Sequence, residues 1–300
     1  MNGAGFICAV VAAILFGVGG TFAQFLFQQR GVSIDWLVTM RLLCAGSVLV
    51  LVAVLRQGRE VLTIWRSDAL SLILFGIAGM LAVQYTYMAA IDASNTATAT
   101  VLQFTAPAMI ALWLALVGRR LPARRELGAI ALAMLGTFFL VTHGKWGALS
   151  ISPLALFWGL ASAVAAAFNS IQPAQLLRRH GASVVAGWGM MVGGVALSFV
   201  HPPWRVMGVW DTTSYVFTAF ILLFGTLAAF YLYAKALKLI GAQRSSVLTS
   251  AEPLSAAVLA VAWLGVSWGG MDWLGTACIL VTIALLAKEQ SEETQSEKLT

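Results

Sequence analysis

Charged residues are scarce in this chain of 300 residues. Only 10% are Asp, Glu, Lys or Arg, whereas soluble domains carry about 25%. A soluble globular fold is excluded because too little polar surface would face water. Hydrophobic residues instead make up 60% of the chain, which indicates a protein surrounded by lipid.

Cysteine and histidine are also rare. The three cysteines lie in apolar runs, and their spacing matches neither a disulfide framework nor a zinc site: Cys8, Cys44 and Cys278. The three histidines fall in separate loops: His143, His180 and His201. We therefore expect no metal centre and no cofactor.

Catalytic motifs are missing as well. No G-x-x-x-x-G-K-[ST] phosphate loop occurs, which argues against ATP-driven pumping by this chain. Neither H-E-x-x-H nor G-x-S-x-G occurs, and no histidine lies inside an apolar run. We do not expect an enzyme.

Long apolar runs are abundant. A membrane span needs roughly 20 apolar residues, and about ten such runs occur. They lie at about 5–27, 33–55, 69–90, 95–117, 127–142, 153–177, 183–200, 214–237, 245–264 and 271–287. The sequence therefore predicts an all-α integral membrane protein with about ten transmembrane helices.

Basic residues concentrate in alternate loops between these runs. With a cytoplasmic N-terminus, the even-numbered loops carry twelve Lys and Arg residues and the odd-numbered loops carry three. Both termini are thus expected on the cytoplasmic side of the cytoplasmic (inner) membrane. Most tryptophans fall at the predicted outer helix ends, as interfacial aromatic residues do. The net charge of +6 reflects this topology and does not indicate a nucleic-acid partner.

An element of two tyrosines and a proline occurs twice without a gap, 146 residues apart: Tyr85-x-Tyr87…Pro107 and Tyr231-x-Tyr233…Pro253. A glycine pair extends the match upstream: Gly79 and Gly225. Because each half has an odd number of helices, the second half must enter the membrane from the opposite side. The sequence predicts two inverted five-helix repeats, 1–145 and 150–288, and a disordered cytoplasmic tail, 289–300.

Together these features resemble the drug/metabolite transporter superfamily, specifically its EamA-type carriers with ten helices. The resemblance is carried by Phe104-Thr105-Ala106-Pro107, Ala251-Glu252-Pro253, Phe16-Gly17 and Arg41. One departure is the absence of the Leu-Gly-Glu turn that commonly ends each x-x-P helix: the copies read Val117-Gly118-Arg119 and Leu264-Gly265-Val266. The resemblance implies export of amino acids and related metabolites, without identifying the cargo.

A central cavity is expected between the repeats, lined by helices 1, 3, 4, 6, 8 and 9. The candidate substrate-binding residues are Phe16, Tyr85, Gln103, Phe104, Trp158, Asn169, Tyr231, Thr249 and Glu252. Residues two apart on a helix point about 200° apart, so each tyrosine pair can send only one ring inward. The sequence does not decide which one. For any single aromatic residue, lipid contact or packing is the alternative.

Two charged residues lie about eight residues inside predicted helices. Arg41 either contacts a substrate carboxylate or is a structural charge satisfied by backbone carbonyls or Asp35. Glu252 either exchanges protons as the coupling site, binds a substrate ammonium group, or bonds within the bundle.

Glycine and proline mark candidate helix breaks or hinges: Gly17, Gly19, Gly20, Pro107 and Pro253. Glycine permits bending or close helix approach, and close packing is the alternative to a hinge. Proline removes a backbone donor and frees carbonyls, which a wet cavity or neighbouring protein must satisfy.

The sequence thus predicts a secondary transporter that exports small amino acids or related metabolites by alternating access. Its expected partners are the small-molecule substrate and the lipid bilayer, with protons as the candidate coupling ion. One alternative is export of amphipathic cations or drugs, attracted to aromatic rings and Glu252. A second is a channel or a lipid-scrambling protein.

Overall fold

The computed structural model describes residues 3–117, 124–143, 151–233, 235–236, 239–240, 248 and 251–297. All regular secondary structure in these ranges is helical, which confirms the predicted all-α class. Each of the ten predicted apolar runs coincides with helix in the described residues.

The first half contains five passes, where a pass is a helical segment that corresponds to one predicted membrane span. Its third and fourth passes are each divided into shorter helices. The elements are α1 (Gly3–Arg30), α2 (Ile34–Gln57), η1 (Gly58–Leu62), α3 (Thr63–Ser67), α4 (Ala69–Leu74), η2 (Phe75–Leu81), α5 (Ala82–Ala93), α6 (Thr96–Gln103), α7 (Ala106–Val117) and α8 (Arg124–Thr142). The η2 segment is a π-helix within an otherwise α-helical pass.

The second half repeats this order. Its elements are α9 (Pro153–Ile171), α10 (Ala174–His180), α11 (Ala182–Val200), α12 (Thr212–Leu222), η3 (Leu223–Ala228), α14 (Ala251–Ala262) and α15 (Gly270–Glu297). The α15 helix continues through residues 289–297, where the sequence predicts a disordered tail. Glu and Gln, which make up most of this segment, are good helix formers, so a polar segment can prolong a helix that begins in an apolar run.

Within the described residues, six helices are long and apolar enough to cross a membrane: Gly3–Arg30, Ile34–Ser67, Ala69–Ala93, Pro153–Ile171, Ala182–Val200 and Thr212–Tyr233. Shorter apolar helices lie at Ile130–Phe139, Ala251–Ala262 and Gly270–Thr282. This composition is that of an integral membrane protein.

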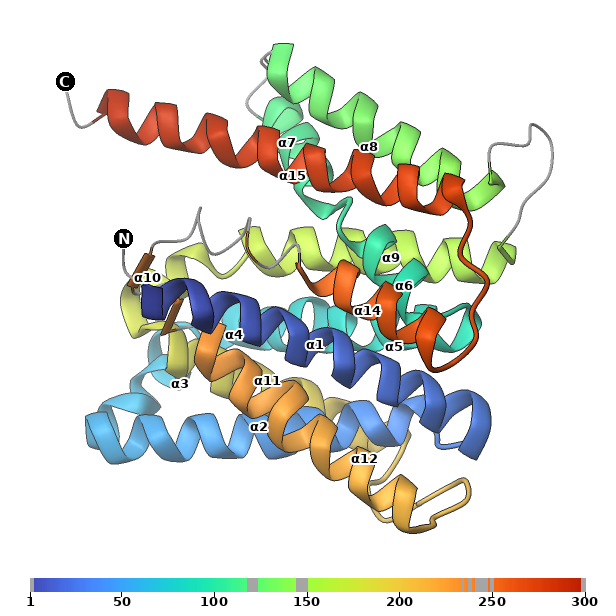
Figure 1. Cartoon of the computed structure of the whole chain (residues 1–300). Coiled ribbons are helices and arrows are strands. Elements are labelled where there is room, and N and C mark those ends of the chain that lie inside the picture. Colours follow the sequence, from blue (N-terminus) through green and yellow to red (C-terminus); the bar gives the residue numbers. More distant parts are fainter. Residues whose placement is uncertain are drawn as a thin grey trace.

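Helix packing follows a two-fold relation between the halves (Figure 1). The second passes pair with each other, α2 with α11, and the fifth passes pair likewise, α8 with α15. The first pass of one half, α1, packs against α12 and α14 of the other; α9 correspondingly packs against α5 and α6. Each half thus inserts its first helix between the third and fourth passes of the other, as inverted repeats do.

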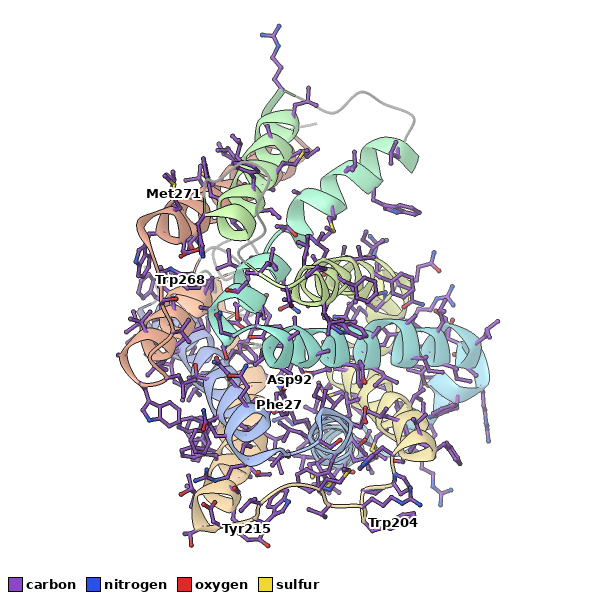
Figure 2. The ribbon with its side chains drawn as sticks, turned by 90° about the vertical axis from the view of Figure 1, so that its right-hand side faces the viewer. Phe27, Asp92, Trp204, Tyr215, Trp268 and Met271 are labelled. Atoms are coloured by element: carbon purple, nitrogen blue, oxygen red, sulfur yellow. The ribbon has the colours of Figure 1, made fainter. Side chains whose placement is uncertain are left out.

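Aromatic side chains lie at one end of the bundle. We call the end where α1 begins the N-terminal face and the other end the opposite face (Figure 1). Figure 2 views the bundle from the opposite face, where Trp204, Tyr215 and Trp268 lie. Trp204 is 79% exposed there. Exposed aromatic rings at helix ends are typical of a membrane–water interface.

Candidate functional site

Small residues let α1 lie very close to its neighbours. The helix runs unbroken through Gly17, Gly19 and Gly20. A Cβ on Gly17 would stand 3.0 Å from the backbone oxygen of Glu252, and one on Gly20 would stand 3.2 Å from the hydroxyl of Tyr87. These glycines therefore serve close helix packing; a hinge at them stays a prediction.

Arg41 is 7% exposed and is the eighth of the 24 residues of α2. Its Nε donates to Thr226 Oγ1 at 3.1 Å and its NH1 lies 3.6 Å from Met88 Sδ. Thr226 belongs to η3, so this bond crosses from one half to the other. A guanidinium has five N–H donors, and the two contacts above leave donors available for a further acceptor.

Glu252 lies in the first turn of α14, directly before Pro253. It interacts electrostatically with Arg41, Tyr87 and Tyr233. Its side chain is only half-buried, although it lies among the central helices. The structure thus brings two charges from different halves into one region. We call it the charged centre, formed by Arg41, Tyr87, Thr226, Tyr233 and Glu252.

A chain of hydrogen bonds leads away from the charged centre. The Tyr87 hydroxyl lies 2.8 Å from Thr100 Oγ1, which in turn donates to the Thr96 carbonyl at 2.7 Å. Because Thr100 uses its single proton on that carbonyl, Tyr87 must be the donor to Thr100. The backbone N–H of Thr96 donates to Gln24 Oε1 at 2.8 Å. These bonds fix α1, α5 and α6 relative to one another.

The structure distinguishes the members of each tyrosine pair. Tyr87 is 8% exposed, and Tyr233 is half-buried beside Glu252. Tyr231, by contrast, is 63% exposed, and the Tyr85 ring packs against Trp158 at 6.0 Å. The rings that reach the charged centre are therefore Tyr87 and Tyr233, whereas the sequence candidates were Tyr85 and Tyr231.

The remaining sequence candidates have their own packing partners. Phe16 meets the Phe230 ring edge-on at 5.1 Å, and Phe104 packs near Val101 and Ile279. Gln103 Nε2 donates to Ser162 Oγ at 2.7 Å, which links the two halves. Asn169 Oδ1 is buried without a hydrogen-bond partner among the described residues. Thr249 lies outside the described residues.

Two helix interruptions lie beside prolines in the described residues. The fourth pass is interrupted between Gln103 and Ala106, directly before Pro107. The sixth pass is interrupted at Gln172 and Pro173, between α9 and α10. Pro253 instead lies in the first turn of α14, where a missing backbone donor breaks no intrahelical bond.

An apolar groove of about 570 Å³ opens between α7, α8 and α9. Its lining is Thr105, Ala108, Met109, Leu112, Ile130, Ala133, Met134, Thr137, Phe138, Leu156 and Leu160. None of these residues belongs to the charged centre. The groove is suited to hydrocarbon contact, so the candidate site for a polar substrate is the charged centre.

Thr226 is the contact that local sequence reasoning missed. Its position matches Met80 in the first repeat, next to the glycine pair. The available signal was a difference between the repeats: Thr226 has a hydroxyl group where Met80 has a thioether. Its partner Arg41 is 185 positions away, so no local pattern connects them.

Comparison with known proteins agrees with this architecture. The EamA-like transporter family matches residues 3–142 and 153–288, which correspond to the two halves. The chain is 40% identical over 286 residues to the uncharacterized inner membrane transporter YicL of Salmonella typhimurium, covering 94% of this chain and 95% of that protein. A solved structure, described only as "Crystal structure of protein", has a TM-score of 0.60 and 18% identity, covering 97% and 99% of the two chains; this likeness concerns the fold alone. The chain is a membrane transporter and belongs to the EamA-like transporter family.

Proposed function

We propose that this transporter exports small amino acids or related metabolites across the cytoplasmic membrane by alternating access. The observation that carries the proposal is the charged centre, where Arg41 of the first half and Glu252 of the second interact. Charges at membrane depth are costly and generally face a partner or a solvated cavity. A site made by both halves is what a carrier with inverted repeats requires.

A zwitterion fits this pair of charges. An amino acid carries a carboxylate and an ammonium group on one carbon atom. Arginine binds carboxylates through its planar fork of donors, and a glutamate accepts hydrogen bonds from an ammonium group. The rings of Tyr87 and Tyr233, which also interact with Glu252, supply apolar walls with a polar tip for the rest of the substrate.

Glu252 is the proposed coupling group. When the substrate ammonium group leaves, the carboxylate loses its partner in an apolar region and takes up a proton. Outward movement of substrate is then linked to inward movement of a proton. Both termini are proposed to be cytoplasmic, as the basic loops indicate.

A lone amphipathic cation fits the site less well. Glu252 and the aromatic rings would attract it, but the guanidinium of Arg41 would repel it. Competition by amino acids or by quaternary amines in one flux assay discriminates between the two substrate classes.

The test is radiolabelled flux into liposomes that contain the purified protein. We expect saturable flux of an amino acid, inhibited by other amino acids that compete for the site. The rate of this flux should depend on an imposed pH gradient. Competition by quaternary amines alone would replace the amino-acid proposal with cation export. Unsaturable flux, or scrambling of a fluorescent lipid without amino-acid flux, would overturn the carrier proposal itself.

A further inference from the structure

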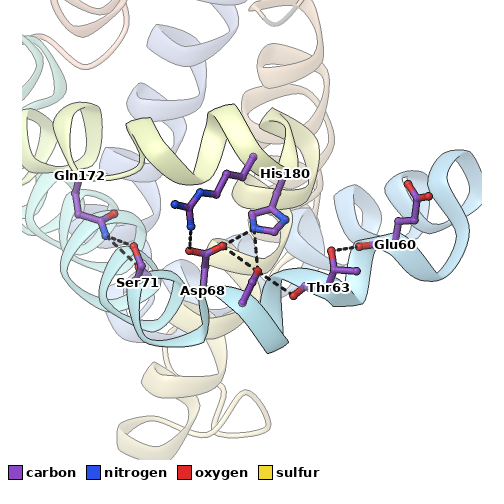
Figure 3. Close-up of polar contacts among 8 residues, drawn as sticks. Glu60, Thr63, Asp68, Ser71, Gln172 and His180 are labelled. Carbon is purple, nitrogen blue, oxygen red and sulfur yellow. Dashed lines mark hydrogen bonds and ion pairs between the residues drawn. The ribbon is translucent and has the colours of Figure 1, made fainter.

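A charged cluster joins the two halves at the N-terminal face (Figure 3). Asp68 lies between α3 and α4, and Arg179 and His180 end α10. Asp68 Oδ1 is 2.8 Å from Arg179 NH1, and Asp68 Oδ2 is 2.8 Å from His180 Nε2. Ser67 Oγ donates to Asp68 Oδ2 at 2.9 Å. Nearby, Gln172 Nε2 donates to the Ser71 carbonyl and hydroxyl, both at 3.1 Å.

A second ion pair joins the halves at the opposite face. Asp211 precedes α12, and Arg30 ends α1. Arg30 NH2 and Nε lie 3.1 Å and 3.2 Å from Asp211 Oδ2. The Val209 N–H also donates to the Arg30 carbonyl at 2.8 Å.

The two clusters occupy equivalent places in the inverted halves. In each, an aspartate directly before the third pass of one half binds a basic residue at the end of the first pass of the other. These passes pack together along the bundle, α1 with α12 and α9 with α5. The two-fold relation that pairs the helices therefore also pairs the clusters, and places one at each face (Figure 1).

The clusters differ in chemistry and burial. The side chains of Asp68 and His180 are 13% and 10% exposed, whereas those of Arg30 and Asp211 are 28% and 41% exposed. Histidine is the side chain that ordinarily changes charge between about pH 5 and 8. Only the cluster at the N-terminal face contains one.

We propose that the two clusters are matched latches on opposite faces of the transporter, and that protonation of His180 tightens the latch at the N-terminal face. A protonated His180 sets a second full positive charge beside Arg179 against the Asp68 carboxylate. Hydrogen bonds from His180 and Ser67, and the charge of Arg179, hold the pKa of Asp68 below its ordinary value, which keeps this carboxylate charged.

Three arginines lie on the helix that carries His180 or on the neighbouring segment α3. Arg178 and Arg179 precede His180 on α10, and Arg66 lies on α3. The neighbouring helix α11 carries no charged residue. The direct 2.8 Å contact with Asp68 makes the carboxylate the closest charged partner of His180.

This inference rests on the alternating access proposed above, but its test needs no cargo. Spin labels are attached in a background with Cys8, Cys44 and Cys278 replaced by Ala. One pair of exposed sites reports the N-terminal face, Glu60→Cys with Gln175→Cys; another reports the opposite face, Gln29→Cys with Thr212→Cys. Distance distributions are recorded in lipid nanodiscs at about pH 6 and about pH 8.

We expect the population with separated labels at the N-terminal face to rise about two- to five-fold when the pH is raised from about 6 to about 8. His180→Gln should abolish the dependence, and His180→Arg should hold the face closed at both pH values. Asp68→Asn should open the N-terminal face, and Asp211→Asn the opposite face. A folded wild-type protein without a pH response, or a response that persists in both His180 variants, overturns the latch. Amino-acid flux in those same preparations would leave the transport proposal standing.

Discussion

The two halves share a scaffold but not their charges. Each has a π-helical segment in its third pass and a proline in its fourth. Where the second half has Glu252, however, the first has Ala106, and where the second has Thr226, the first has Met80. The repeat supplies the frame and the two tyrosines of the charged centre, Tyr87 and Tyr233, whereas Arg41, Thr226 and Glu252 have no counterpart in the other half.

The largest expected effect comes from neutralising Glu252, a charge that the first half lacks. Glu252→Gln keeps the size of the side chain but removes its charge opposite Arg41. We expect amino-acid flux to fall about 100-fold, because losing a hydrogen bond between the charged carboxylate and the substrate ammonium group costs about 1.5–3 kcal/mol. The measurement is kcat/KM for flux into liposomes.

Arg41→Gln should have a similar effect, and the double variant should be no worse than either single one. Glu60→Gln, which changes an exposed carboxylate outside the centre, is the control and should transport normally. Wild-type flux in Glu252→Gln at every pH would remove both the substrate and the proton role of this residue.

The next prediction compares two glycines in equivalent helix contacts. A Cβ on Gly17 of α1 would meet backbone atoms of α14, including Ala256 N at 3.1 Å. A Cβ on Gly159 of α9 would meet only the side chain of Leu102 among its nearest atoms. Gly17→Ala should therefore destabilise the protein by about 1–3 kcal/mol through overpacking. Gly159→Ala should destabilise the protein less, because its closest contact is with the end of the Leu102 side chain and not with backbone.

Thermal unfolding in detergent measures this difference. Equal melting temperatures for the two variants would contradict the close α1–α14 contact. Gly3→Ala, at a position with open space around it, controls for the change in helix propensity.

A smaller effect separates the two tyrosine pairs. Tyr87→Phe removes the donor to Thr100 and should cost about 1 kcal/mol. Tyr231→Phe changes a ring that is 63% exposed, so the free energy of unfolding should change by less than about 0.5 kcal/mol. If Tyr231→Phe instead impairs flux more than Tyr87→Phe and Tyr233→Phe do, the assignment of inward rings is wrong.

The smallest expected effect concerns acid stability. Ser214 and Arg30 hold the pKa of Asp211 below its ordinary value, as His180, Ser67 and Arg179 do for Asp68. A depressed folded-state pKa stabilises the protein above the ordinary value of about 3.9, and this contribution is lost as the pH falls through the lower folded-state value. The melting temperatures of wild type and Asp211→Asn should therefore converge below about pH 4. A constant gap down to pH 2 would contradict the contribution of this ion pair.

Much of the fold could be predicted because lipid imposes simple rules. Spans must be long and apolar, so the runs of hydrophobic residues located the ten passes. The tyrosine–proline element identified the duplication. Pro107 pointed to an interrupted fourth pass, and the structure has such an interruption between Gln103 and Ala106.

The site could be predicted only in part. Arg41 and Glu252 stood out because charged residues are rare inside apolar helices. Their proximity, and the bond between Arg41 and Thr226, depend on how α2, η3 and α14 pack. That packing lies between segments far apart in the sequence, which periodicity within one helix does not report.

The π-helical segments η2 and η3 have a consequence for how each third pass can turn. A π-turn accommodates one more residue than the surrounding α-helix. Successive residues of an α-helix are about 100° apart, so an extra residue swings everything beyond it by about that angle. In both halves the π-helical segment lies between the aspartate of the latch, Asp68 or Asp211, and the tyrosine pair. Migration of the extra residue past the tyrosine pair would rotate those rings relative to the rest of the pass, without unwinding the helix on either side.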